Sequence, residues 1–256
     1  MIKDNLDERN AEFEQKPLTT PLFLNSVPKS GTHLMRNIVR MFVPVEQQYH
    51  DTFIQIPLLN QHATAFDPRT PKVSWGHLLY SDESALATSF AKNILLVRDP
   101  YTWVLARARF FLSENFDGKL DHLRSERISG NDLINMMIFG IHGKAPEMAD
   151  VYKHNAAAWL GTGVKLYRFE DLMKHLKQLD SDDAAAFFSQ LFEDCGIEKP
   201  NDWRERVLIG SDKAQSGTAR DNLTVDDSRI PRELSDLQKQ LVNVAVPGLR
   251  ALLGYE

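Results

Sequence analysis

Five consecutive residues near the N-terminus have the side chains of an anion site: Lys29, Ser30, Gly31, Thr32 and His33. An apolar, strand-like run precedes them, and a segment with apolar residues at helical spacing follows. A loop between a strand and a helix N-terminus points backbone N–H groups and the helix dipole at one place. Gly31 would let an anion approach the backbone, and Lys29 adds a full charge. The pattern favours a phosphate-type site over its alternative, a plain strand–helix turn with a Ser/Thr cap.

Two more reactive side chains stand where predicted strands end. Arg98 follows the apolar run ILLV and precedes Pro100, which is typical of a helix start. An arginine in that position can hold a phosphate through two parallel hydrogen bonds. His77 lies in a segment rich in β-forming residues, and it is the histidine whose setting suits a general base, although a lone histidine is often structural.

Four strand-like segments, at 21–27, 72–80, 91–98 and 164–169, alternate with helix-like segments. The clearest helices are predicted at 31–43, 101–116, 184–197 and 231–246. This alternation predicts an α/β fold with a central parallel sheet and helices on both faces. Ligands in such sheets bind beyond the carboxyl ends of the strands, so Lys29, His77 and Arg98 should meet at one edge.

The composition is that of an ordinary globular protein. The 256 residues favour one domain, residues 19–256, after a polar extension of residues 1–18. The formal net charge of −5 argues against a broad nucleic-acid or anionic-membrane surface. The first residues are charged rather than signal-like, and no apolar run is long enough to span a membrane. The single cysteine, Cys195, is predicted to be a buried hydrophobe; it suits a reducing compartment, and we expect a cytoplasmic protein.

The segment VPKSGTHLM closely resembles the phosphosulfate-binding loop of the sulfotransferases that use 3′-phosphoadenosine 5′-phosphosulfate (PAPS). Other motifs of that family follow in the same order over residues 20–256. The strand end at Arg98 resembles the 3′-phosphate motif, and His77 matches the family's catalytic histidine. The segment YRFEDL resembles a strand–helix junction whose tyrosine contacts the adenine side, and Phe169 stands in that position here.

The chain departs from the family pattern in three places. Ala106 stands where the family has a serine eight residues after the arginine, and Phe169 lacks the tyrosine hydroxyl. The usual C-terminal Arg-Lys-Gly loop is replaced by SDKAQSGTARDNLT, in which Arg220 or Lys213 could contact the 3′-phosphate. Arg107 and Arg109 follow Ala106 closely and are predicted to be solvated cations on a helix face.

The resemblance implies a single-domain, P-loop-NTPase-like sulfotransferase fold. It also implies transfer of a sulfuryl group from PAPS to a hydroxyl or amine of a small-molecule acceptor, without a metal. His77 would be the base, and Lys29 would stabilise the leaving oxygen. The residues expected to bind PAPS are Lys29, Ser30, Gly31, Thr32, His33, Arg98, Phe169 and Arg220.

Two other functions use the same features. A P-loop kinase of a small molecule shares the strand–loop–helix anion site, but the Gly-Lys-Ser/Thr ending is missing and Asp99 is the one candidate for holding magnesium. A non-catalytic nucleotide-binding protein is the other alternative.

The acceptor site is expected near residues 116–145 and 50–62. Within the first of these segments, Met136, Met137, Ile138 and Phe139 are predicted to be core residues rather than an acceptor wall.

Overall fold

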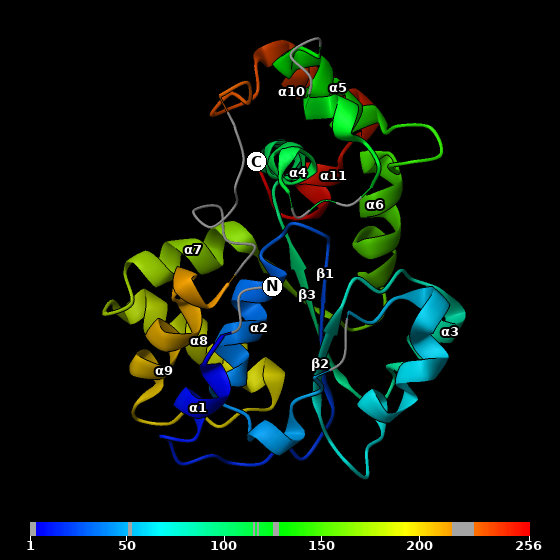
Figure 1. Cartoon of the computed structure of the whole chain (residues 1–256). Helices are drawn as coiled ribbons and strands as arrows, with labels where there is room; N and C mark the ends of the chain where they lie inside the picture. Colours follow the sequence, from blue (N-terminus) through cyan, green and yellow to red (C-terminus); the bar gives the residue numbers. More distant parts are fainter. Residues whose placement is uncertain (1–3, 51–52, 115, 117, 125–127, 217–227) are drawn as a thin grey trace.

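A four-stranded parallel sheet forms the centre of the molecule in the computed structural model (Figure 1). The structure describes residues 4–50, 53–114, 116, 118–124, 128–216 and 228–256. The strands β1 (Leu22–Ser26), β2 (Val73–Gly76), β3 (Lys92–Val97) and β4 (Lys165–Arg168) lie in the order β2-β1-β3-β4. The predicted α/β class with a central parallel sheet is confirmed.

Helices connect the strands and cover both faces of the sheet (Figure 1). The α-helices described are α1 (Leu6–Asn10), α2 (Thr32–Arg40), α3 (Asp82–Ala87), α4 (Pro100–Leu112), α5 (Gly130–Phe139), α6 (Met148–Asn155), α7 (Phe169–Lys177), α8 (Asp182–Cys195), α9 (Trp203–Ser211), α10 (Asp236–Ala245) and α11 (Leu249–Leu252). Short 3₁₀ segments include η2 (Ile56–Phe66), η4 (Ala157–Trp159) and η5 (Lys213–Gln215).

The sheet separates two hydrophobic cores because successive side chains of a strand point to opposite faces. In β1, Phe23 packs into the core formed with α4, α5 and α6, while Leu22 and Leu24 pack into the core formed with α2, α8 and α9. Both inner strands are therefore apolar on both faces, which explains the continuous apolar runs in the sequence. Cys195 is fully buried in the second core, as predicted.

The N-terminal segment, predicted as a polar extension, packs against α2 within its described part. Leu6 is buried, and the amide of Asn10 donates to the carbonyl oxygens of Arg40 and Val43 at 2.7 and 3.0 Å. The carboxylate of Asp4 pairs with Arg40 at 3.0 Å. This segment therefore contributes to the second core.

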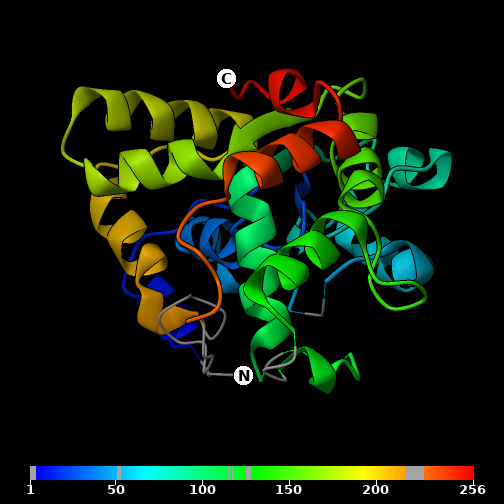
Figure 2. The same cartoon turned by 90° about the horizontal axis from the view of Figure 1, so that it is seen from above.

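Helices α4, α5, α10 and α11 lie beyond the carboxyl ends of the strands, as the view from above also shows (Figure 2). Helix α10 contacts both α4 and α5. The C-terminal part of the chain thus lies at the edge of the sheet where the reactive residues were expected. Among the described helices, none is long and apolar enough to cross a bilayer.

Candidate active site

The ends of three neighbouring strands bring the predicted site residues together. β1 runs into the loop of Lys29, β2 ends one residue before His77, and β3 ends one residue before Arg98. The guanidinium of Arg98 donates to the carbonyl oxygen of Lys29 at 3.3 Å, and Nδ1 of His77 lies 2.9 Å from the carbonyl oxygen of Ser26. The parallel sheet therefore places the three side chains at one edge.

The loop after β1 has the conformation of an anion cradle. Lys29 (φ 67°) and Gly31 (φ 93°) both adopt left-handed backbone conformations, which is costly for lysine and is often found at functional sites. Gly31 is the N-cap of α2, and no side chain caps the first turn of that helix. The hydroxyl of Ser30 is fully buried and has no hydrogen-bond partner among the described residues. Such an unsatisfied group next to a helix N-terminus fits a bound oxyanion.

His77 is held in the tautomer that a base requires. A carbonyl oxygen only accepts, so the 2.9 Å contact with Ser26 requires Nδ1 to carry the proton and leaves the lone pair on Nε2. The hydroxyl of Ser26 lies 3.2 Å from Nδ1 and 2.7 Å from Oγ1 of Thr32, which connects the histidine to the anion loop. Burial lowers the pKa of His77 to about 4, the hydrogen bond to Ser26 opposes this, and the nearby Lys29 lowers it further.

Lys29 folds back over an aromatic ring. Its Nζ lies 3.0 Å from the centroid of the Phe110 ring in α4, a cation–π contact. Burial lowers the pKa of Lys29 from 10.5 to about 7. The neighbouring His33 has its pKa lowered to about 3, first by burial and then by the charges of Arg36 and Lys29. Burial thus disfavours the protonated forms of Lys29 and His33, and a bound anion would stabilise them.

Arg98 is fixed on three sides. Its Nε donates to Oγ1 of Thr102 at 3.0 Å, its Nη1 donates to Lys29, and its guanidinium lies 4.6 Å from the centroid of the Phe169 ring. Phe169 also packs on the anion loop, since a Cβ added to Gly31 would lie 2.5 Å from its ring. Residues from the VPKSGTHLM loop, the Arg98 strand end and the YRFEDL junction thus form one contiguous cluster.

The two arginines that follow Ala106 are not solvated cations, and that prediction was wrong. Arg107 and Arg109 are buried, with 4% and 9% exposed. Arg107 donates to the carbonyl oxygens of Met137 and Pro146 at 2.9 and 2.7 Å, so it joins α4 to α5. Burial lowers the pKa of Arg107 to about 10. The prediction failed because the sequence of α4 alone does not reveal the second layer, α5 and the segment after it, whose carbonyl oxygens accept from the buried guanidinium of Arg107.

The four residues of α5 that were predicted to lie in the core, Met136 to Phe139, differ in burial. Met137 and Ile138 are core residues as predicted, Met136 is partly buried against that core, and Phe139 is 46% exposed. The prediction was wrong for Phe139, because a helix buries only one face and residue 139 ends the helix on the other side.

Asp99, the carboxylate considered for magnesium, already has partners. It caps α4 through the backbone N–H of Tyr101 at 3.0 Å and accepts two bonds from Arg250 at 3.0 and 2.9 Å. Within the part of the chain that the structure describes, no three His, Cys, Asp or Glu side chains gather as metal ligands.

The two cations predicted as further 3′-phosphate contacts differ in what can be said of them. Arg220 lies outside the described residues. Lys213 is exposed and lies in η5. That short segment contacts α2, since the carbonyl oxygen of Gln215 accepts from Asn37 at 3.1 Å.

Sequence reasoning missed several side chains that contact the predicted site residues, among them Phe53, Thr102, Phe110 and Tyr152, and it missed Glu170, which bonds to Thr102. Phe53 stacks on His77, with ring centroids 4.9 Å apart and an interplanar angle of 11°. This contact brings the segment at 50–62 next to the histidine. Thr102 lies four residues after Arg98, in the first turn of α4, and that spacing could have identified it.

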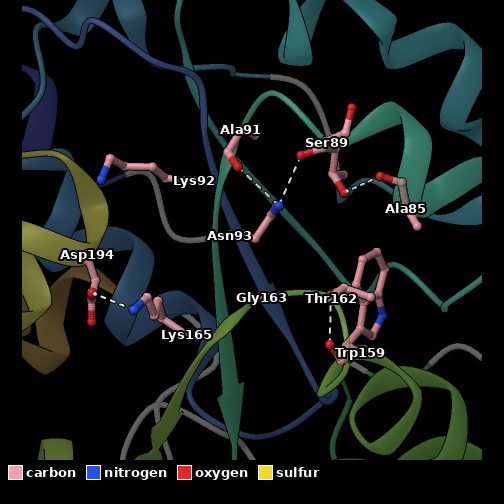
Figure 3. A pocket seen from close by; sticks show the side chains of 11 residues that line it. Ala85, Ser89, Ala91, Lys92, Asn93, Trp159, Thr162, Gly163, Lys165 and Asp194 are labelled. Carbon is pink, nitrogen blue, oxygen red and sulfur yellow. Dashed lines mark hydrogen bonds and ion pairs between the residues drawn. The ribbon is translucent and has the colours of Figure 1, made fainter.

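A surface pocket of about 400 Å³ lies at the opposite edge of the sheet, where β3 and β4 begin (Figure 3). Several of the polar side chains that line it bond to other protein groups. Lys165 pairs with Asp194 at 3.6 Å, and the amide of Asn93 donates to the carbonyl oxygens of Thr88 and Ala91. None of the predicted site residues lines this pocket.

The whole chain is similar in structure to a sulfotransferase. One matching crystal structure is that of mouse sulfotransferase SULT7A1 complexed with PAP, with a TM-score of 0.60 and 13% sequence identity, and the match covers 100% of this chain and 94% of the mouse chain. No protein-family model matches the sequence. Comparison with curated proteins gives no match either. At this identity the likeness establishes a shared fold.

Proposed function

We propose that this protein is a sulfotransferase that moves a sulfuryl group from PAPS to a hydroxyl or amine of a small-molecule acceptor. One observation carries the proposal: Lys29, His77 and Arg98, from three neighbouring parallel strands, meet at one edge of a fold shared with a PAP-bound sulfotransferase. The VPKSGTHLM motif and its order relative to Arg98 and His77 support the same reading.

The anion loop would hold the 5′-phosphosulfate. The unpartnered hydroxyl of Ser30 and the uncapped first turn of α2 supply donors, and the cradle at Gly31 admits an oxyanion close to the backbone. His33, in the same turn, would border the phosphosulfate. Arg98 would bind the 3′-phosphate, because its Nη2 makes no hydrogen bond among the described residues. Phe169 would pack against the adenine, and Arg220 is proposed as a further 3′-phosphate ligand.

The donor supplies an activated sulfuryl group, and the protein's own groups handle the proton and the charge. Nε2 of His77 takes the proton from the acceptor hydroxyl or amine as that atom bonds to sulfur. The bond from sulfur to the bridging oxygen breaks, and the ammonium of Lys29 stabilises the charge that collects on that oxygen. Since a sulfuryl group carries less charge than a terminal phosphoryl, the scheme gives no role to magnesium.

The acceptor would approach from the side of Phe53, whose ring stacks on His77. An aromatic wall beside the base favours an acceptor with an apolar part next to its nucleophilic group. A cytoplasmic location stays a prediction, in keeping with the single buried Cys195.

The test is transfer of radiolabelled sulfate from PAPS to a panel of phenols, alcohols and amines by the purified protein. We expect product with at least one acceptor class, and its loss in the His77→Ala variant. Phosphoryl transfer from ATP–Mg²⁺ instead would favour the kinase. Binding of PAP without transfer to any acceptor would favour the non-catalytic nucleotide-binding protein.

A further inference from the structure

Glu170, at the start of α7, connects several segments around Arg98. Its carboxylate accepts from the backbone N–H of Asp99 at 3.2 Å and from the hydroxyl of Thr102 at 2.9 Å. The hydroxyl of Tyr255, one residue from the end of the chain, donates to its other oxygen at 2.8 Å. A single carboxylate therefore joins the end of β3, the first turn of α4 and the C-terminal tail.

Thr102 links the Glu170 carboxylate to the guanidinium of Arg98. The Thr102 hydroxyl has two acceptors within reach, Glu170 at 2.9 Å and the carbonyl oxygen of Asp99 at 3.2 Å, and the charged carboxylate at the shorter distance is the stronger acceptor. The Thr102 oxygen accepts from Nε of Arg98 at 3.0 Å. Bonds in such a chain polarise one another and fix the orientation of each member. Nε and Nη1 of Arg98 are used in these contacts, whereas Nη2 makes no hydrogen bond among the described residues.

The C-terminal tail is tied to the same corner by further contacts. Arg250 of α11 binds both carboxylate oxygens of Asp99 and lies 4.2 Å from the centroid of the Tyr101 ring. Arg168 of β4 donates to the carbonyl oxygen of Gly254 and lies over the Tyr255 ring, 5.4 Å from its centroid. Burial, followed by the charge of Glu170, raises the pKa of Tyr255, so its hydroxyl stays a donor.

We propose that Tyr255, acting through Glu170 and Thr102, is a positioning residue that aims Arg98 at the 3′-phosphate and so sets the preference for a 3′-phosphorylated nucleotide. This inference rests on the proposed function. It assigns the C-terminal tail a part in donor selection at a site where the family's usual serine is replaced by Ala106. A tail that merely tethered the fold would affect all nucleotides equally.

The test compares calorimetric affinities for PAP and for adenosine 5′-monophosphate, which lacks the 3′-phosphate. Tyr255→Phe removes one hydroxyl and keeps the ring over Arg168. It should weaken PAP binding about threefold to tenfold, and Thr102→Val about tenfold, with the monophosphate affinity unchanged. Thr102→Ser, which restores a hydroxyl, should recover the wild-type ratio of the two affinities.

The matched control is Tyr167→Phe, which removes a tyrosine–carboxylate bond of the same kind, to Asp194 at 2.7 Å. It should leave the ratio unchanged. An unchanged ratio in Tyr255→Phe, whether the two affinities are both unaffected or equally weakened, overturns the positioning role of Tyr255 whatever Thr102→Val does. Wild-type protein that binds no PAP overturns the proposed function and this inference with it, and that result is recognised before any variant is made.

Discussion

Replacing Lys29 by methionine should stabilise the folded protein while it abolishes turnover. Each tenfold change in a proton equilibrium is worth about 1.4 kcal/mol. The fall in the pKa of Lys29 from 10.5 to about 7 therefore means that keeping this buried lysine charged costs about 5 kcal/mol of folding free energy at low pH. Methionine has a similar length, can pack on Phe110 and carries no charge, so it removes this cost.

The stability advantage of the Lys29→Met variant over the wild type should fall as the pH rises. Below pH 7 the lysine is protonated in both states and the full cost applies. Between pH 7 and 10.5 the unfolded chain binds the extra proton, so the stability of the wild type rises with pH and the methionine variant loses its advantage. We expect that advantage to fall from about 5 kcal/mol at pH 6 to about 2 kcal/mol at pH 9.

Urea unfolding of both proteins at several pH values between 6 and 9 measures the difference. Folded His33 and His77 have pKa values of about 3 and 4, so neither titrates in the native state over this range. Lys153→Met, at an exposed position on α6, is the control and should change stability by less than about 0.5 kcal/mol at every pH. An advantage for Lys29→Met that does not vary with pH, or a less stable variant at pH 6, would refute the burial argument.

The remaining predictions concern His77, Arg98 and Gly31. His77→Ala should lower kcat by about 10²–10⁴-fold with PAP affinity unchanged. In the wild type, kcat/KM should decline on the acid side near pH 4 rather than 6.5, because burial keeps the free histidine neutral; a decline near 6.5 would contradict the environment described for it. Arg98→Ala should weaken PAP binding about 10–100-fold in calorimetry and leave adenosine 5′-monophosphate binding unchanged, and equal losses would argue against a 3′-phosphate contact. Gly31→Ala should cost about 1–3 kcal/mol in urea unfolding, because its φ is 93° and its Cβ would lie 2.5 Å from the Phe169 ring, whereas Gly161→Ala, with open space around it, should be tolerated.

The strand–loop–helix at Lys29 and the meeting of three strand ends were predictable from local pattern. Continuous apolar runs identify strands that are buried on both faces, and parallel topology then forces their carboxyl ends to one edge. The same reasoning placed Arg98 at the start of a helix, which begins at Pro100. These features depend on neighbours in sequence and on general rules of sheet topology.

The contacts that orient the site were not predictable in that way. Glu170 meets Tyr255 across 85 residues, and Arg98 meets the carbonyl of Lys29 across 69. Such pairs depend on how α7 and the C-terminal tail pack on β3, and no short-range spacing encodes that packing. The burial of Arg107 was missed for the same reason, since its partners lie on α5 and on the segment after it.

The most direct test of the central claim is the affinity of the wild-type protein for PAP measured against its affinity for ATP with Mg²⁺, by titration calorimetry at pH 7. The geometry of Lys29, Ser30 and Arg98 predicts that PAP binds without metal and more tightly than ATP–Mg²⁺. Tighter binding of ATP–Mg²⁺, or no binding of PAP, would contradict the account.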